Sequence, residues 1–336
     1  MLPSIFFIVN PKSRSGNTEK IWDKKILPEV LSVFPNANWS FTNSPFAASI
    51  YANYAKNIGY DIVVAVGGDG TINEIVNGLL GNILNSELLT TENIKIFGKK
   101  SDLSIKKNNS IPLLACMPLG TGCDFVRTIG IPKNIKKSLE IILRQNSISC
   151  DVGLIEFNQE SIPKKRYFVN IGGCGANGQT IEIIKDRKNK ILGRKGSFLI
   201  AAIRTLLRNK SFPVEICYDN NEIISTDLTV LFVCNGKFCG GGMKVSPEAS
   251  LQNGKFKIVQ VNKMNYLKSI FMMNRLYKGN YSGLEYAITE KEVSSVTIKP
   301  QNNDLIPTEC DGELPGYLPA TFSIMPNQIS IIANIN

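Results

Sequence analysis

Short apolar runs alternate with amphipathic stretches along the first 145 residues of the chain. The apolar runs predict buried strands at 3–10, 38–42, 61–66 and 111–118. The stretches between and after them predict helices at 17–34, 45–57 and 134–145. A further helix is predicted after Gly70, where apolar residues recur at the i, i+3, i+4, i+7, i+8 spacing of one helical face: Ile72, Ile75, Val76, Leu79 and Leu80. Strands that alternate with helices at this rhythm predict a parallel α/β sheet.

The pattern changes near Cys150, where short strands separated by turns replace the alternation. Runs such as "DVGLIEF", "PVEICYD", "TDLTVLFVCNG" and "QISIIANI" predict an antiparallel β-sandwich or barrel, interrupted by a basic helical insertion near 176–210. The polar residues 91–110 have no steady period and predict a surface insertion. We therefore expect an α/β domain at 1–145 and a β-sandwich domain at 146–336.

Two glycine loops carry the candidate chemistry of the first domain. In "DIVVAVGGDGT", an apolar strand runs directly into Gly67, Gly68 and Gly70, and a helix follows. Free N–H groups and the helix dipole attract anions at such a junction, and glycine lets the backbone approach a phosphate. The loop "PLGTGCDF" repeats this order before Asp124. A carboxylate beside a phosphate needs a cation between them, so Asp69 predicts bound Mg²⁺.

The composition excludes several kinds of catalysis. The chain has no histidine, which excludes Ser-His-Asp hydrolysis, Cys-His proteolysis and phosphohistidine transfer. Any general base must then be a carboxylate or, less readily, Lys, Tyr or Cys. The eight cysteines form no CxxC pair, so they predict free thiols in a reducing compartment rather than a zinc site.

The formal net charge of +10 predicts an anionic partner. Residues 185–210 carry nine Lys or Arg side chains against one Asp, which suits either a solvated helical face or contact with lipid headgroups. No recognition motif or basic-aromatic interleaving indicates nucleic acid. No apolar run approaches the length of a membrane span, and the first residues do not resemble a signal peptide. We expect a cytoplasmic protein with transient peripheral membrane association.

The motifs together resemble the diacylglycerol kinase catalytic-domain family, which includes sphingosine, ceramide and bacterial lipid kinases. The resemblance rests on "VNPKSRSG", "VGGDGTINEIVNG", "PLGTGCDFVRTIGIP", "DVG", "GGGMKVSPEASLQNGKF" and "DGE", which occur in the family's order over nearly the whole chain. It implies an α/β nucleotide-binding domain, a β-sandwich domain and an ATP cleft between them. It also implies ATP and a membrane lipid as substrates, with Mg²⁺, and it allows a homodimer.

The resemblance assigns roles to individual residues. The residues implied to hold ATP are Asn10, Pro11, Lys12, Ser13, Arg14, Ser15, Thr42, Gly67, Gly68, Asp69, Gly70, Thr71, Ile72, Asn73 and Thr121. The aspartates implied to organise catalytic Mg²⁺ through bound waters are Asp69, Asp124 and Asp151. Glu313 resembles the family's general base, and the missing histidine independently leaves a carboxylate as the natural proton acceptor.

Two positions depart from the family's pattern. Cys123 stands where the second loop usually has Asn, and the lost amide costs about 1–2 kcal/mol if its hydrogen bonds were buried. We expect reduced activity or a shifted loop. Asn253 replaces the Asp of a structural Mg²⁺ site whose carbonyl positions fall at Ser250 and Lys255. Because a neutral amide is a poor sole side-chain ligand for a hard dication, this site is predicted to be weak or absent.

The residues leave three functions open. The first is an ATP-dependent lipid kinase, most simply one that converts diacylglycerol to phosphatidate. The second is an NAD kinase, whose family shares GGDGT and the two-domain plan. The third is a nucleotide-binding regulator with weak or no catalysis, suggested by Cys123 and Asn253.

The prediction for the second metal site can be measured directly. We expect isothermal titration of the ATP-free protein with Mg²⁺ to give no tight binding, since Asn253 supplies no charge. Tight binding that the substitution Asn253→Ala abolishes would contradict this expectation.

Overall fold

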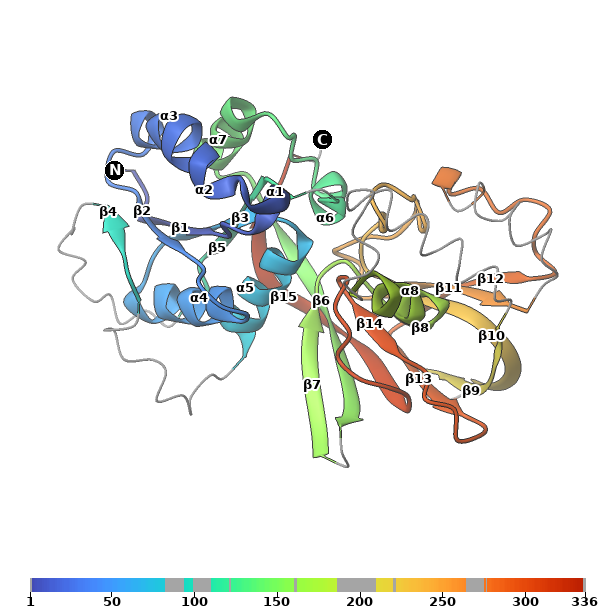
Figure 1. Cartoon of the computed structure of the whole chain (residues 1–336). Coiled ribbons are helices and arrows are strands. Elements are labelled where there is room, and N and C mark those ends of the chain that lie inside the picture. The colour runs from blue at the N-terminus through green and yellow to red at the C-terminus, as the bar shows by residue number, and fades with distance from the viewer. Residues whose placement is uncertain are drawn as a thin grey trace. The chain divides into compact units, whose positions relative to one another are not determined.

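The chain folds into two compact units. The computed structural model (Figure 1) describes residues 2–81, 94–98, 110–120, 122–159, 162–185, 210–219, 222–263, 275 and 277–334. One unit comprises Met1–Cys150 together with Asn327–Asn336, and the other comprises Asp151–Pro326. The last ten residues therefore belong with the first unit, although the sequence assigned them to the second domain.

The first unit is built on a mostly parallel sheet. Its strands are β1 (Ile5–Val9), β2 (Asn38–Phe41), β3 (Ile62–Gly67), β4 (Phe97–Gly98) and β5 (Leu113–Pro118), in the order β5-β3-β1-β2-β4. The strands β1, β2, β3 and β5 run parallel, whereas β4 pairs antiparallel with β2. Both β1 and β3 are buried along their whole length, as central parallel strands must be. The predicted α/β class is confirmed.

Helices cover both faces of this sheet (Figure 1). On one face lie α3 (Leu27–Val33) and α7 (Ile135–Arg144), and on the other lie α4 (Ala47–Ile58) and α5 (Asp69–Leu80). The single helix predicted up to Phe34 is instead a series of short segments: α1 (Ser13–Gly16), α2 (Thr18–Ile21), the π-helical η1 (Trp22–Ile26) and α3. Gly16, at φ +85°, ends α1 because a right-handed helix cannot continue through the left-handed region.

The helices α4 and α5 pack closely at a glycine. A Cβ added to Gly78 of α5 would lie 2.1 Å from the carbonyl oxygen of Ser49 on α4. The Ser49 hydroxyl donates to the Glu74 carbonyl at 2.6 Å, and the Asn53 amide donates to the Gly78 carbonyl at 3.3 Å. The predicted apolar stripe of α5 faces inward, with Ile72, Ile75, Val76 and Leu79 buried.

The second unit is an antiparallel β domain, as predicted. Its strands are β6 (Ser147–Gln159), β7 (Ile162–Phe168), β8 (Ile171–Gly175), β9 (Phe212–Tyr218), β10 (Glu222–Cys234), β11 (Phe256–Asn262), β12 (Ile288–Val293), β13 (Ser295–Pro300), β14 (Thr308–Cys310) and β15 (Ala320–Ile332). The main order is β12-β11-β10-β9-β13-β15, and β8 pairs with both β10 and β14. The strands β6 and β15 run through the boundaries between the two units.

Stacked aromatic rings fill the core of the second unit. Phe168 stacks on Phe256 with ring centroids 5.6 Å apart and meets the edge of Phe322 at 6.1 Å. All three rings are fully buried. One helix, α8 (Ala176–Lys185), follows β8 directly. The rest of the predicted basic insertion, at 186–209, lies outside the described residues, as does most of the predicted insertion at 91–110.

Within the described ranges, no helix combines the length and the apolar character that crossing a bilayer requires.

The close approach at Gly78 allows a test of packing against helix propensity, because the two predict opposite changes in stability for Gly78→Ala. Propensity alone favours Gly78→Ala by about 1 kcal/mol. We expect the substitution to lower the melting temperature instead, because the new methyl group would collide with the Ser49 carbonyl. Thermal unfolding followed by circular dichroism measures this, and a raised melting temperature would show that α4 can move away.

Candidate functional site

The carboxyl ends of the parallel strands bring the first candidate residues to one edge of the sheet. Asn10 follows β1, Thr42 follows β2, and Gly67 closes β3. The Asn10 N–H donates to the Val66 carbonyl at 2.9 Å, and the Thr42 N–H donates to the Val9 carbonyl at 2.9 Å. In parallel α/β sheets this edge is where ligands bind.

A hydrogen bond joins the first two motifs at this edge. The Asn10 amide donates to the Thr71 hydroxyl at 3.0 Å. A Cβ on Gly67 would lie 2.4 Å from that same hydroxyl oxygen, so only glycine leaves room for it. Glycine at position 67 is therefore required by Thr71 itself, in addition to any role toward a phosphate.

The segment after β1 is a compact turn. The Lys12 N–H donates to the Asn10 side-chain oxygen at 3.0 Å, and the Ser13 hydroxyl donates to the Asn10 carbonyl at 2.9 Å. Ser13 also contacts the Thr18 hydroxyl at 2.6 Å. Pro11 lies in the same turn. The side chains of Arg14 and Ser15 lie outside the described part of the structure.

Two other predicted nucleotide-binding residues lie with their side chains in the helix core. Ile72 is 3% exposed and Asn73 is fully buried. The Asn73 side-chain oxygen accepts a hydrogen bond from Asn77 one turn later at 3.3 Å. Both side chains therefore take part in the packing around α5.

The two glycine loops touch each other through their backbones. The N–H groups of Leu119 and Gly120 both donate to the Gly67 carbonyl at 2.9 Å. A Cβ on Gly120 would lie 2.5 Å from the Gly68 Cα atom, so the loops could not approach as closely with a larger residue there. Thr121, the predicted ligand between Gly120 and Gly122, lies outside the described residues.

Asp69 clamps the second loop to the first. Its two carboxylate oxygens accept the N–H groups of Asp124 and Phe125, each at 3.1 Å, at the start of α6 (Asp124–Thr128). Burial raises the pKa of Asp69, while these N–H donors oppose the shift. The sequence analysis predicted a Mg²⁺ role for Asp69 and did not predict these hydrogen bonds. A carboxylate that lies at the N-terminus of a helix is stabilised by the N–H groups and the helix dipole there.

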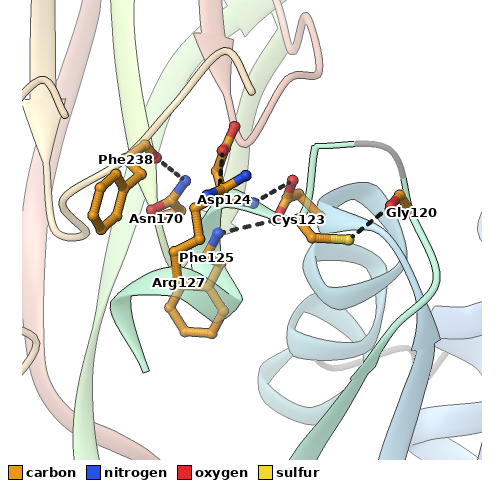
Figure 2. A network of polar contacts seen from close by, with 8 residues as sticks. Gly120, Cys123, Asp124, Phe125, Arg127, Asn170 and Phe238 are labelled. Carbon is orange, nitrogen blue, oxygen red and sulfur yellow. Dashed lines mark hydrogen bonds and ion pairs between the residues drawn. The ribbon is translucent and has the colours of Figure 1, made fainter. Parts of the chain in front are cut away.

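Cys123 occupies a strained position in this loop. Its φ of +53° lies in the left-handed region, where Asn is more common than Cys. The thiol is buried and contacts the Gly120 carbonyl at 3.2 Å (Figure 2), and burial raises its pKa to about 11. The neighbouring Asp124 is also buried, with Arg127 Nε 3.5 Å from its carboxylate.

Asp151 holds a loop of the second unit. Its carboxylate accepts the Gly254 N–H at 2.7 Å, and its own N–H donates to the Leu251 carbonyl at 2.7 Å. The buried Asp151 side chain therefore fixes the "SLQNGKF" segment. This is the segment where the sequence predicted a weak or absent second metal site.

The polar side chains of that segment bond to its own backbone. Asn253 accepts the Lys255 N–H at 3.2 Å, and Ser250 accepts the Gln252 N–H at 3.2 Å. Over the ranges that the structure describes, no group of three or more His, Cys, Asp or Glu side chains could hold a metal ion.

Glu313 follows a tight hairpin turn. Asp311 and Gly312 both have positive φ, at +50° and +83°, as the central residues of a type I′ turn do. Cys310 and Glu313 exchange backbone hydrogen bonds across the turn, each at 2.9 Å. The Asp-Gly pair is a strong hairpin signal in a sequence, so this geometry could have been predicted.

Asp311 anchors the hairpin, a role that sequence reasoning did not assign. Its carboxylate accepts three consecutive N–H groups, those of Val169, Asn170 and Ile171, at 2.9, 3.0 and 3.2 Å. The first unit thus gathers Asn10, Thr42, the GGDGT loop and Asp124, while Asp151 and Glu313 belong to the second unit.

Comparisons with known proteins agree with this architecture. The family model described as "Diacylglycerol kinase catalytic domain" matches residues 4–155, and that described as "YegS C-terminal NAD kinase beta sandwich-like domain" matches residues 174–333. A curated diacylglycerol kinase from Staphylococcus aureus (strain bovine RF122 / ET3-1) is 27% identical over 322 residues, 92% of this chain and 87% of the relative.

Solved structures share the fold. A crystal structure of a diacylglycerol kinase from Bacillus anthracis strain Sterne has a TM-score of 0.67 at 22% identity, covering 99% of this chain and 97% of that one. Yeast NADH kinase complexed with NADH has a TM-score of 0.52 at 11% identity, covering 100% of this chain and 84% of that one. At these identities the likeness extends to the fold alone.

The clamp by Asp69 makes its substitutions informative even without a ligand. We expect Asp69→Ala to lower the stability of the first unit by about 1–3 kcal/mol, because the N–H groups of Asp124 and Phe125 lose their acceptor. Asp69→Asn keeps one acceptor oxygen and should lose less. Thermal unfolding without nucleotide or Mg²⁺ checks this order. Equal stability of all three proteins would mean that Asp69 does not hold the second loop.

Proposed function

The chain belongs to the diacylglycerol kinase catalytic-domain family, and we propose that it transfers the γ-phosphate of ATP to the hydroxyl group of a membrane lipid, most simply diacylglycerol. The observation that carries this proposal is the pair of glycine loops, bonded together by Asp69 at the carboxyl edge of the parallel sheet. Exposed N–H groups at such an edge suit a triphosphate. The choice of diacylglycerol as the lipid follows from the curated relatives, which are named diacylglycerol kinases.

The proposed roles follow the chemistry of each group. Asn10 to Ser15 and the GGDGT loop would bind and orient the phosphates of ATP. Mg²⁺ bound with ATP would neutralise charge on the β- and γ-phosphates during transfer. As the resemblance to the family implies, Asp69 and Asp124 would face that ion through bound waters, while the Asp69 oxygens also accept the two N–H groups of the second loop.

Glu313 is the proposed proton acceptor. A lipid hydroxyl must lose its proton as its oxygen attacks the γ-phosphorus, and the chain has no histidine to take it. Glu313 directly follows the tight Asp311-Gly312 turn, and its backbone is hydrogen-bonded to Cys310. This limits the positions that the Glu313 carboxylate can reach. The positive net charge would favour approach to an anionic lipid surface.

The test is a phosphorylation assay over a panel of acceptors. The purified chain is incubated with radiolabelled Mg-ATP and mixed micelles of diacylglycerol, monoacylglycerol, sphingosine or ceramide, with NAD in a parallel tube. We expect phosphate transfer to a glycerolipid, reduced by about 10²–10⁴-fold in Glu313→Gln, since general-base catalysis contributes that much. Glu290→Gln, the same change at an exposed position of β12, should stay within about twofold of the wild type.

Each other result points to a different function. Full activity of Glu313→Gln would reject the proposed base. Transfer to NAD alone would make the chain an NAD kinase. Nucleotide binding measured by calorimetry, with no transfer to any acceptor, would indicate a regulator.

A further inference from the structure

Glu309 is a buried carboxylic acid that the proposed reaction does not use. It lies on β14, two residues before the hairpin turn, and is 6% exposed. In the pairing of β14 with β8 it stands opposite Gly173. Glutamate is almost never fully buried unless it has partners, so the contacts of this side chain need a reason.

Its two oxygens join the hairpin turn to the start of α8. The Gly312 N–H donates to Oε2 at 3.2 Å, and the Asn177 amide donates to Oε1 at 3.3 Å. Asn177 is itself fixed, because its side-chain oxygen accepts the Gly178 N–H at 2.9 Å. The carboxyl group therefore bridges two backbone segments.

The backbone donors of the turn show why this bridge matters. The N–H groups of Cys310 and Glu313 are used between the two arms of the hairpin, and the Asp311 N–H donates to the Ile171 carbonyl at 2.9 Å. The Gly312 N–H is the remaining donor, and Glu309 accepts it. This bond fixes the Asp311–Gly312 peptide, which lies one residue before the Cα atom that carries the Glu313 side chain.

We propose that Glu309 is a positioning residue for Glu313, holding the Asp311-Gly312 turn from inside the fold through the Gly312 N–H. The proposal rests on the proposed function, in which Glu313 is the general base. Asp311 fixes the same turn from the other side, through the N–H groups of residues 169–171. Removing either carboxylate would leave one of the two attachments.

The charge of Glu309 is set by its surroundings. Burial raises its pKa to about 8, and the negative charge of Asp311 raises it further, while the donors on Gly312 and Asn177 oppose the shift. In the described part of the chain, the titratable groups that interact with Glu309 include Asp311 and three thiols on the packed strands, Cys174 of β8, Cys234 of β10 and Cys310 of β14, and burial raises the pKa of each thiol. Near neutral pH the carboxyl is therefore largely protonated.

The direction of the pH dependence follows. The folded chain holds the Glu309 proton more tightly than the unfolded chain, whose carboxyl has the ordinary pKa of 4.5. The stability that Glu309 contributes is therefore complete below about pH 4.5 and falls as the pH rises toward 8. Glu309→Gln cannot ionise, so its melting temperature relative to the wild type should rise between pH 5 and pH 8.

The decisive experiment compares Glu309→Met, Glu309→Gln and Thr308→Val in the lipid assay. Thr308→Val is the matched control, since it removes a hydrogen bond at 2.9 Å from the same strand to Gly316 without touching the turn. We expect Glu309→Met to lower kcat about tenfold with little change in the KM for ATP. Glu309→Gln, which keeps a side-chain oxygen to accept the Gly312 N–H, should keep most of the activity.

Three outcomes would overturn the proposal. One is a wild-type kcat in Glu309→Met, and another is an equal loss of kcat in Thr308→Val at equal stability. The third is a loss of kcat in Glu309→Gln as large as that in Glu309→Met.

A measurement without substrate separates this proposal from the proposed function. Hydrogen–deuterium exchange of peptides that contain residues 310–314 should be faster in Glu309→Met than in the wild type or Thr308→Val, whatever the chain phosphorylates. Faster exchange with no lipid kinase activity in the wild type would retain the fixed turn and reject Glu313 as a lipid kinase base. Unchanged exchange would reject the positioning role directly.

Discussion

The two oxygens of Asp69 join the glycine loops of the first unit, and the candidate nucleotide site depends on that junction. The first loop supplies the carboxylate and the second supplies the N–H groups of Asp124 and Phe125. Such charge-assisted bonds are stronger than neutral ones, and they hold a second loop whose Cys123 has an unfavourable backbone conformation. The glycines allow the approach, because a Cβ at Gly120 would meet the Gly68 backbone.

The second unit uses carboxylates in the same way. Asp151 accepts the Gly254 N–H. Asp311, two residues before Glu313, accepts the three N–H groups of residues 169–171. Each of these acids is buried and accepts hydrogen bonds from backbone N–H groups. Backbone dipoles cannot move away or titrate, so they hold a carboxylate, and the loop that carries it, in one place. The aspartates of a kinase-like sequence therefore shape its loops as well as any metal environment.

Much of the fold could be predicted from the sequence. The alternating strands and helices of the first unit and the antiparallel strands of the second gave the right classes, because apolar periodicity reports directly which face of an element is buried. The region before Phe34 was less predictable, since short helical turns and a π-helical segment have no distinct period. The assignment of residues 327–336 to the first unit also escaped the sequence, because Ile331 pairs with Leu114, more than two hundred residues away.

By itself the sequence determined the kinds of groups available: two glycine loops after strands, carboxylates as the only strong candidate bases, and an Asp-Gly turn before Glu313. Only the tertiary structure decided what each carboxylate bonds to. Asp69 and Asp124 meet although 55 residues separate them, and Glu309 meets Asn177 across 132 residues. The physical reason is that a local pattern encodes burial and turn geometry, whereas the partner of a buried charge is set by which distant backbone N–H groups the packed strands and helices bring to it.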